Sequence, residues 1–240
     1  MKRSARYYDA IYAAAGKDYA KEARAIRSIV AARKRSAGDA LLDVACGTGA
    51  HLAHLRSWFD VEGLDVSSEM LEVAAARCPD VPLHRADMRD FDLPRRFDAV
   101  ICLFSAIGYC TTLADLRRAV NAMARHAAPG GIVIIEKWLG PDEFNSGRID
   151  LVVVDEPELK VARLNTTSVD GSVSRLHMQY LAGTPEGIEH FCEDIALGLF
   201  TRDQYAAAMS DAGLSATFEP NGFAGRGLFV CDKPLDMEAR

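Results

Sequence analysis

The chain has 240 residues, of which 49% are hydrophobic and 26% are charged, with 28 Lys and Arg against 34 Asp and Glu. This composition is typical of a globular protein with a sizeable core and excludes a disordered or low-complexity chain. The formal net charge of -6 argues against a dedicated nucleic-acid or anionic-membrane binder, because such proteins usually present a basic face.

The sequence shows no sign of a secreted, membrane-spanning or metal-binding protein. Its first thirty residues carry charged side chains in place of an apolar run, and no uncharged apolar stretch reaches the roughly 18 residues of a membrane span. The six cysteines are scattered without a Cys-x-x-Cys pair, which favours free thiols. His51 and His54, one turn apart, are interpreted as surface residues of a helix. We therefore predict a cytoplasmic protein with no metal, nucleic-acid or membrane partner.

Apolar positions at helical spacing predict two N-terminal helices within 7–35, separated by Gly16. From residue 38 onward, near-continuous apolar runs alternate with helical patterns. This alternation predicts an α/β fold with a doubly wound, mainly parallel sheet. The expected strands lie at 40–45, 61–65, 81–84, 97–104 and 131–136, and the expected helices begin at 51, 67 and 113.

From residue 141 the pattern changes to extended runs separated by turn signals, which predicts an inserted antiparallel β-sheet over 141–200. Asp170-Gly171 is one such hairpin signal. A helix over 202–212 that ends at Gly213, and a strand at 228–231, complete the chain. We expect one domain that consists of N-terminal helices (1–37), a core that binds the ligand (38–138), the insertion (141–200) and a C-terminal helix and strand (201–240).

Glycines and acids stand at the ends of three successive predicted strands. The first strand runs into residues 43–49 (DVACGTG), where glycines allow backbone N–H groups to approach a ligand closely. Asp65 ends the second strand, where a carboxylate can accept both ribose hydroxyls of a nucleoside. Asp87 and Met88 follow the third and suit an adenine amino group and ring. The third glycine of the dinucleotide fingerprint is missing, which favours a nucleoside without phosphates, although each acid alone also fits a helix cap or a turn.

These segments resemble the ordered motifs of class I S-adenosylmethionine-dependent methyltransferases, which have a Rossmann-like sheet of seven strands. The resemblance covers 38–138 and includes 42–49 (LDVACGTG), 63–67 (GLDVS), 87–91 (DMRDF), 97–100 (FDAV) and 128–131 (APGG). It implies S-adenosylmethionine as the cofactor, with Gly47 near the methionine portion, Asp65 on the ribose and Asp87 on the adenine. The cofactor-binding residues that it implies are Tyr19, Asp43, Ala45, Gly47, Gly49, Asp65, Met70, Asp87, Met88 and Phe104.

A narrower resemblance extends over nearly the whole chain. It is similar to bacterial N,N-dimethyltransferases of dTDP-linked amino sugars, which act in antibiotic biosynthesis, and the matching segments are 16–19 (GKDY), 104–109 (FSAIGY), 199–205 (LFTRDQY) and 225–229 (GRGLF). The chain departs from that family's pattern at Tyr109, where the family has histidine, and at 136–139 (EKWL), where it has Glu-Pro-Trp-Trp.

This narrower resemblance implies an acceptor site and an assembly. Ser105 and Tyr109 would be catalytic and face the amino sugar, Tyr8 and Tyr19 would line the site, and Arg226 would meet the pyrophosphate. The antiparallel insertion would form a homodimer. The three tyrosines also have a plain structural interpretation as packed aromatic rings, and Arg226 has one as an ion-pair partner.

Methyl transfer from a sulfonium to an amine is an in-line displacement that depends more on alignment and desolvation than on a strong base. A tyrosine phenol is a weak base at neutral pH, so Tyr109 is expected to hold the amine through its oxygen. Two alternatives remain open: a methyltransferase that acts on another small-molecule or peptide amine or hydroxyl, and a non-catalytic S-adenosylmethionine-binding protein.

Overall fold

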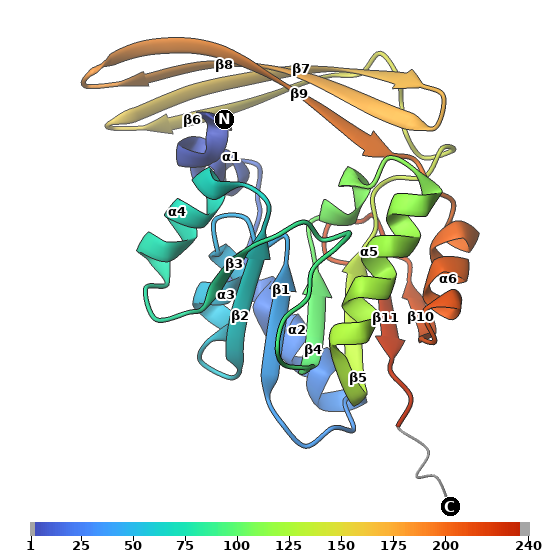
Figure 1. The fold of residues 1–240 in the computed structure, drawn as a ribbon. Helices are drawn as coiled ribbons and strands as arrows, with labels where there is room; N and C mark the ends of the chain where they lie inside the picture. The colour runs from blue at the N-terminus through green and yellow to red at the C-terminus, as the bar shows by residue number, and fades with distance from the viewer. Residues whose placement is uncertain (1–2, 236–240) are drawn as a thin grey trace, which may run out of the picture.

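Two β-sheets organise the computed structural model, which describes residues 3–235, and the smaller sheet lies across one end of the larger (Figure 1). The larger sheet has five parallel strands, namely β1 (Ala40–Val44), β2 (Asp60–Asp65), β3 (Leu83–Arg85), β4 (Phe97–Cys102) and β5 (Ala127–Glu136). It is completed by β10 (Ser215–Glu219) and β11 (Leu228–Asp232), which run antiparallel to their neighbours, in the order β10-β11-β5-β4-β1-β2-β3. The predicted α/β class and mainly parallel sheet are confirmed.

Helices cover both faces of this sheet, so its central strands are buried on both sides. Leu41 packs with α2 (Tyr19–Arg33) and α3 (Ala50–Leu55), whereas its neighbour Leu42 packs on the opposite face with α5 (Leu113–His126) and α6 (Arg202–Asp211). This alternation follows from the two-residue period of a strand and explains why β1 and β4 are uniformly apolar apart from one aspartate each.

Helix starts follow the local sequence signals. Ser67 accepts a hydrogen bond from the backbone of Met70 and caps α4 (Ser68–Arg77), and Thr112 caps α5 in the same way. Thr201 and Gln204 form a reciprocal capping box at the start of α6. The predicted end of that helix at Gly213 agrees with a left-handed glycine there, with φ of +73°.

The smaller sheet is an antiparallel meander that lies across the carboxyl ends of the parallel strands (Figure 1). Its four strands are β6 (Ile149–Glu156), β7 (Leu159–Asp170), β8 (Val173–Thr184) and β9 (Gly187–Gly198). The short helices η1 (Arg3–Tyr7) and α1 (Tyr8–Ala14) pack beneath it, where Tyr7 and Ile11 share an apolar cluster with Met178 and Phe191. The N-terminal segment therefore lies between the two sheets, and its side chains border the space that the sheets enclose.

Three features differ from the sequence-based expectations. The third strand begins at Leu83 and the fifth already at Ala127, and β10 was not predicted. The sequence of β10, Ser-Ala-Thr-Phe-Glu, lacks a strong apolar signal because the strand lies at the sheet edge with most of its side chains exposed.

No helix within the described part of the chain is long and apolar enough to cross a membrane.

Candidate active site

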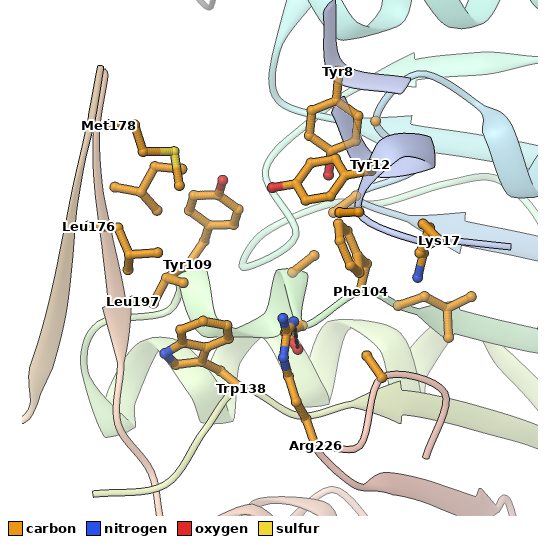
Figure 2. A pocket seen from close by; sticks show the side chains of 18 of the residues that line it. Tyr8, Tyr12, Lys17, Phe104, Tyr109, Trp138, Leu176, Met178, Leu197 and Arg226 are labelled. Carbon is orange, nitrogen blue, oxygen red and sulfur yellow. Dashed lines mark hydrogen bonds between the residues drawn. The ribbon is translucent and has the colours of Figure 1, made fainter. Parts of the chain in front are cut away.

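A cavity of about 1020 Å³ lies between the two sheets and receives side chains from both. Pockets for one drug-sized ligand usually span about 300–1,000 Å³, so this volume can hold a cofactor together with an acceptor. Figure 2 shows part of its lining, with aromatic rings from α1 facing Tyr109, Trp138 and Arg226. Of the predicted site residues, those that line this cavity are Tyr8, Ala45, Gly47, Asp65, Met70, Asp87, Met88, Phe104, Ser105, Tyr109 and Arg226.

The carboxylate of Asp65 organises the glycine loop after β1. Its Oδ2 accepts a hydrogen bond from the Gly47 amide at 2.9 Å, and its Oδ1 accepts one from the Ser67 amide at 2.8 Å. Gly47 has a φ of +56°, which a glycine adopts without strain. A carboxylate has about four acceptor positions, so Asp65 retains capacity for ligand hydroxyls at the edge of the cavity.

Asp43 and Tyr19 border a second, small cavity of about 40 Å³ next to Gly47 and Ala45. The Asp43 Oδ2 and the Tyr19 hydroxyl are both buried without a hydrogen-bond partner. Burial, reinforced by the negative charge of Asp65, raises the pKa of Asp43 to about 8. Buried polar atoms are rarely left unpaired, so these two atoms indicate a polar ligand group in this place.

His51 corrects one sequence-based interpretation. The side chain is buried rather than on the helix surface, and its Nε2 lies 2.8 Å from Glu22 Oε2, to which Lys17 also donates at 2.8 Å. Tyr19 packs edge-on against the His51 ring. Gly49, at the start of the same helix, lines neither cavity, because it packs against Ala74. No cluster of three or more metal-ligating side chains occurs within residues 3–235.

Asp87, after β3, is fixed by its neighbour Arg89. The Arg89 side chain donates to both carboxylate oxygens, at 2.9 and 3.0 Å from Nε, and the Arg89 amide donates to Oδ1 at 2.9 Å. These hydrogen bonds lower the pKa of Asp87, so the group is an ionised acceptor at neutral pH. Met88 lines the cavity beside it.

Three tyrosines and a phenylalanine form an aromatic wall of the cavity (Figure 2). The Tyr8 and Tyr12 ring centroids are 4.5 Å apart, and Tyr12 meets Phe104 edge-on at 4.7 Å. Burial and then the neighbouring phenols raise the pKa of Tyr8 well above its usual range, and burial also raises the pKa of Tyr12. Tyr109 extends into the cavity from the short helix η2 (Ala106–Tyr109), with 43% of its surface exposed. It is therefore not a packed core aromatic.

Phe104 and Ser105 hold an unusual backbone conformation at the end of β4. Both have positive φ, at +52° and +59°, which costs energy for residues other than glycine and is common at functional sites. The buried carboxylate of Glu136 supports this turn, because its Oε2 accepts from the Phe104 amide at 2.6 Å. Its Oε1 accepts from the Ala224 amide at 3.0 Å, which ties the turn to the loop that carries Arg226.

Arg226 extends from that loop toward the middle of the cavity (Figure 2). Its Nη1 donates to Ser105 Oγ at 3.2 Å, and its Cζ lies 4.9 Å from the Trp138 ring centroid. The Ser105 hydroxyl itself donates to the Lys137 carbonyl at 2.7 Å. Burial lowers the pKa of Arg226, against the opposing effect of Glu136, and an arginine remains charged at physiological pH.

Among the residues that line or support this cavity and that sequence reasoning missed are Tyr12, Glu136, Trp138 and Arg163. Tyr12 is four residues after Tyr8 and thus on the same face of α1, a helical spacing that was assigned to core packing.

The comparisons with known proteins agree with this geometry. Residues 41–131 match the family model described as a methyltransferase domain. Over 224 residues the chain is 45% identical to a dTDP-4-amino-2,3,4,6-tetradeoxy-D-glucose N,N-dimethyltransferase of Saccharopolyspora spinosa, which covers 93% of this chain and 90% of the relative. The chain belongs to the sugar N,N-dimethyltransferase family of S-adenosylmethionine-dependent methyltransferases.

Solved structures share the whole fold. DesVI of Streptomyces venezuelae superposes with a TM-score of 0.91 at 40% identity, covering 98% of this chain and 99% of that one. CalS10 of Micromonospora echinaspora, an amino pentose methyltransferase solved with S-adenosylmethionine bound, gives 0.86 at 40% identity over 95% and 96% of the two chains. The protein is thus a methyltransferase, and S-adenosylmethionine is its cofactor.

Proposed function

We propose that this methyltransferase adds two methyl groups to the amine of a dTDP-linked amino sugar. The observation that carries the proposal is the single cavity in which Gly47, Asp65 and Asp87 face the same space as Tyr109 and Arg226. One end suits a nucleoside, and the other combines phenol oxygens with a guanidinium. The names of the family's characterised members support the same acceptor.

The residues around the glycine loop fit S-adenosylmethionine. Asp65 would accept the ribose hydroxyls and Asp87 the adenine amino group, while Met88 would pack on the base. The unpartnered Asp43 Oδ2 suits the α-ammonium group of the methionine portion, and the neighbouring Tyr19 hydroxyl suits a polar group at the same end. When bound, the cofactor supplies an electrophilic methyl group on a sulfonium.

The aromatic wall would hold the acceptor amine in line for transfer. Because burial keeps the phenols of Tyr8 and Tyr12 protonated at neutral pH, neither can remove a proton from the amine. Their oxygens, together with that of Tyr109, can accept hydrogen bonds from the amine N–H groups and orient the nitrogen lone pair. The amine loses its proton to water before transfer, and the role of the site is then alignment and desolvation.

Arg226 would bind the pyrophosphate, as the sequence predicts, because a guanidinium forms paired hydrogen bonds with phosphate oxygens. The flanking Gly225 and Gly227 both have positive φ, and a Cβ on Gly227 would meet the Phe218 ring at 2.5 Å. The hydroxyl of Ser105, predicted as catalytic, donates a hydrogen bond to the Lys137 carbonyl and accepts one from Arg226. We therefore assign Ser105 to positioning Arg226.

A homodimer through the antiparallel sheet remains part of this proposal. The outer face of that sheet carries exposed apolar side chains in register, since Leu151 pairs with Leu164 and Ala162 with Leu181. A contiguous apolar face of this kind marks an interaction surface, and a second copy would cover it symmetrically. Sedimentation velocity should show a dimer that Leu151→Lys converts to monomer, and a monomeric parent enzyme would refute the dimer.

We also propose a cytoplasmic location. All six cysteines are free thiols, which fits a reducing compartment.

The experiment that tests the function is mass spectrometry of products from purified enzyme, S-adenosylmethionine and a panel of dTDP-3-amino and dTDP-4-amino sugars. We expect one substrate to gain a first and then a second methyl group. The same sugar without its nucleotide serves as the control and should be a poor substrate. If no panel member gains a methyl group while the protein still binds the cofactor in calorimetry, the sugar acceptor is wrong.

A further inference from the structure

Arg163 of β7 is a buried cation on the inner face of the antiparallel sheet. Side chains alternate between the two faces of a strand, so Arg163 shares the inner face with Val161, Asn165 and Thr167. Only 8% of its surface is exposed, and it lines the large cavity. A charged side chain in that position needs a compensating partner, because burying an unpaired ion is costly.

The described chain does not supply that partner as a carboxylate. Arg163 forms no ion pair among residues 3–235, and its buried Nε has no hydrogen-bond partner. Its Cζ lies 5.2 Å from the Tyr12 ring centroid, a cation–π contact that neutralises no charge. By contrast, the two buried lysines of the same region are each paired, Lys17 with Glu22 and Lys137 with Glu143.

Four arginines line this cavity. Arg89 pairs with Asp87 and Arg148 with Asp150, whereas Arg226, like Arg163, forms no ion pair within residues 3–235. The Arg163 guanidinium contacts the Tyr12 ring, Tyr12 meets Phe104 edge-on at 4.7 Å, and the Arg226 Cζ lies 5.7 Å from the Phe104 ring centroid, so these rings connect the two arginines. Burial raises the pKa of Tyr12, and the positive charges of Arg163 and Arg226 both oppose that rise. Two guanidiniums that line one cavity, each with a planar set of N–H donors, suit a ligand with two adjacent anionic groups.

We propose that Arg163 binds the diphosphate of the nucleotide-linked acceptor jointly with Arg226. The inference rests on the proposed acceptor class and assigns one of its binding residues to the antiparallel sheet. Arg226 belongs to the loop before β11 and Arg163 to β7, so the diphosphate links the two sheets across the cavity. The Tyr12 ring contacts the Arg163 guanidinium and the Trp138 ring contacts that of Arg226, and these contacts orient both guanidiniums before the ligand binds.

The test is isothermal titration of dTDP, dTMP and thymidine into the full chain saturated with S-adenosylhomocysteine. Arg163→Met should weaken dTDP binding about ten- to hundredfold, the range expected for loss of charge-assisted hydrogen bonds, and leave thymidine binding unchanged. Arg163→Lys, which retains the charge but loses the planar fork, should fall between wild type and Arg163→Met. Arg175→Met is the matched control, because Arg175 lies on the outer face of the same sheet and pairs with Asp170.

The outcomes separate this inference from the proposed function. Equal dTDP affinity in wild type and Arg163→Met overturns the role of Arg163, even if the enzyme methylates dTDP-amino sugars. A parallel loss of thymidine and dTDP affinity also overturns it, because a structural defect affects both ligands. A wild-type protein without dTDP affinity overturns it as well. Loss of dTDP affinity in Arg163→Met, in an enzyme that methylates no amino sugar, supports the anion site and refutes the proposed acceptor. If Arg163→Met does not fold, the Arg163→Lys series decides by the same criteria.

Discussion

The buried carboxyl of Asp43 should make the free enzyme less stable as the pH rises. Its pKa is about 8 in the folded protein, against 3.8 for an unperturbed aspartate. A carboxyl with a raised pKa in the folded state is protonated there while the unfolded chain is ionised, so the free energy of unfolding falls as pH rises through this range. Between about pH 5 and about pH 8 this loss reaches an upper value on the order of 4 kcal/mol.

Replacing Asp43 by Asn removes the group that ionises and keeps its shape. Chemical denaturation of the cofactor-free protein should show similar stability of the variant and wild type near about pH 5. The variant should become more stable than wild type toward about pH 8, by up to a few kcal/mol. The exposed Asp142→Asn is the control and should follow wild type throughout. A constant difference between Asp43→Asn and wild type across this range would refute the raised pKa.

The same substitution separates stability from ligand binding. If the ionised Asp43 pairs with the ammonium group of the cofactor, binding near neutral pH must release the proton that the free carboxyl holds. Calorimetry of S-adenosylhomocysteine in buffers of different ionisation enthalpy should therefore show proton release for wild type and none from this site in Asp43→Asn. The variant should also bind the ligand about ten- to hundredfold more weakly. Unchanged affinity with unchanged proton release would place the ammonium elsewhere.

The remaining predictions concern both ends of the cavity. Asp65→Ala should weaken cofactor binding at least about tenfold, because the Gly47 and Ser67 amides lose their acceptor, while dTDP affinity stays unchanged in calorimetry. Arg226→Ala should instead weaken dTDP binding and leave cofactor affinity unchanged. Tyr109→Phe should lower kcat/KM for the amino sugar about tenfold without shifting the pH profile, since an orienting phenol is not the base. Glu136→Gln should cost about 1–3 kcal/mol in denaturation, because an amide has one acceptor oxygen for the two amides that Glu136 now satisfies. Unaltered stability of that variant would contradict the bridging role.

The sequence placed three aspartates of the predicted cofactor site at one edge of the sheet, where the structure also has them, because the determinants of this placement are local. Asp43, Asp65 and Asp87 lie at or just beyond the carboxyl ends of three parallel strands, and these ends meet at one edge of the sheet. Neither their order nor their placement depends on distant contacts. His51 shows the limit of this reasoning, because its burial depends on Glu22 from a helix 29 residues earlier in the chain.

The sequence did not indicate several residues at the predicted acceptor side of the cavity, because these residues meet only in the tertiary structure. Glu136 accepts a hydrogen bond from the Ala224 amide, 88 residues away, and the local sequence around either residue does not predict this contact. Arg163 follows Val161 by two residues and so shares its face, and a charged residue on an apolar strand face is an unusual signal. The signal becomes interpretable only when the packing of α1 shows which face of the meander is the inner one.

The two sheets therefore contribute different residues to the cavity. The loops of the parallel sheet contribute acids and glycines to the cavity, whereas α1, the loop before β11 and the inner face of the meander line the side that we propose for the acceptor. Substitutions on the inner face, such as those at Arg163, Met178 or Leu176, can change the acceptor without changing the cofactor loops. Sequence changes in β7–β9 can thus adapt the same cofactor-binding fold to different acceptors. For this reason the cofactor motifs alone identify the reaction and not the substrate.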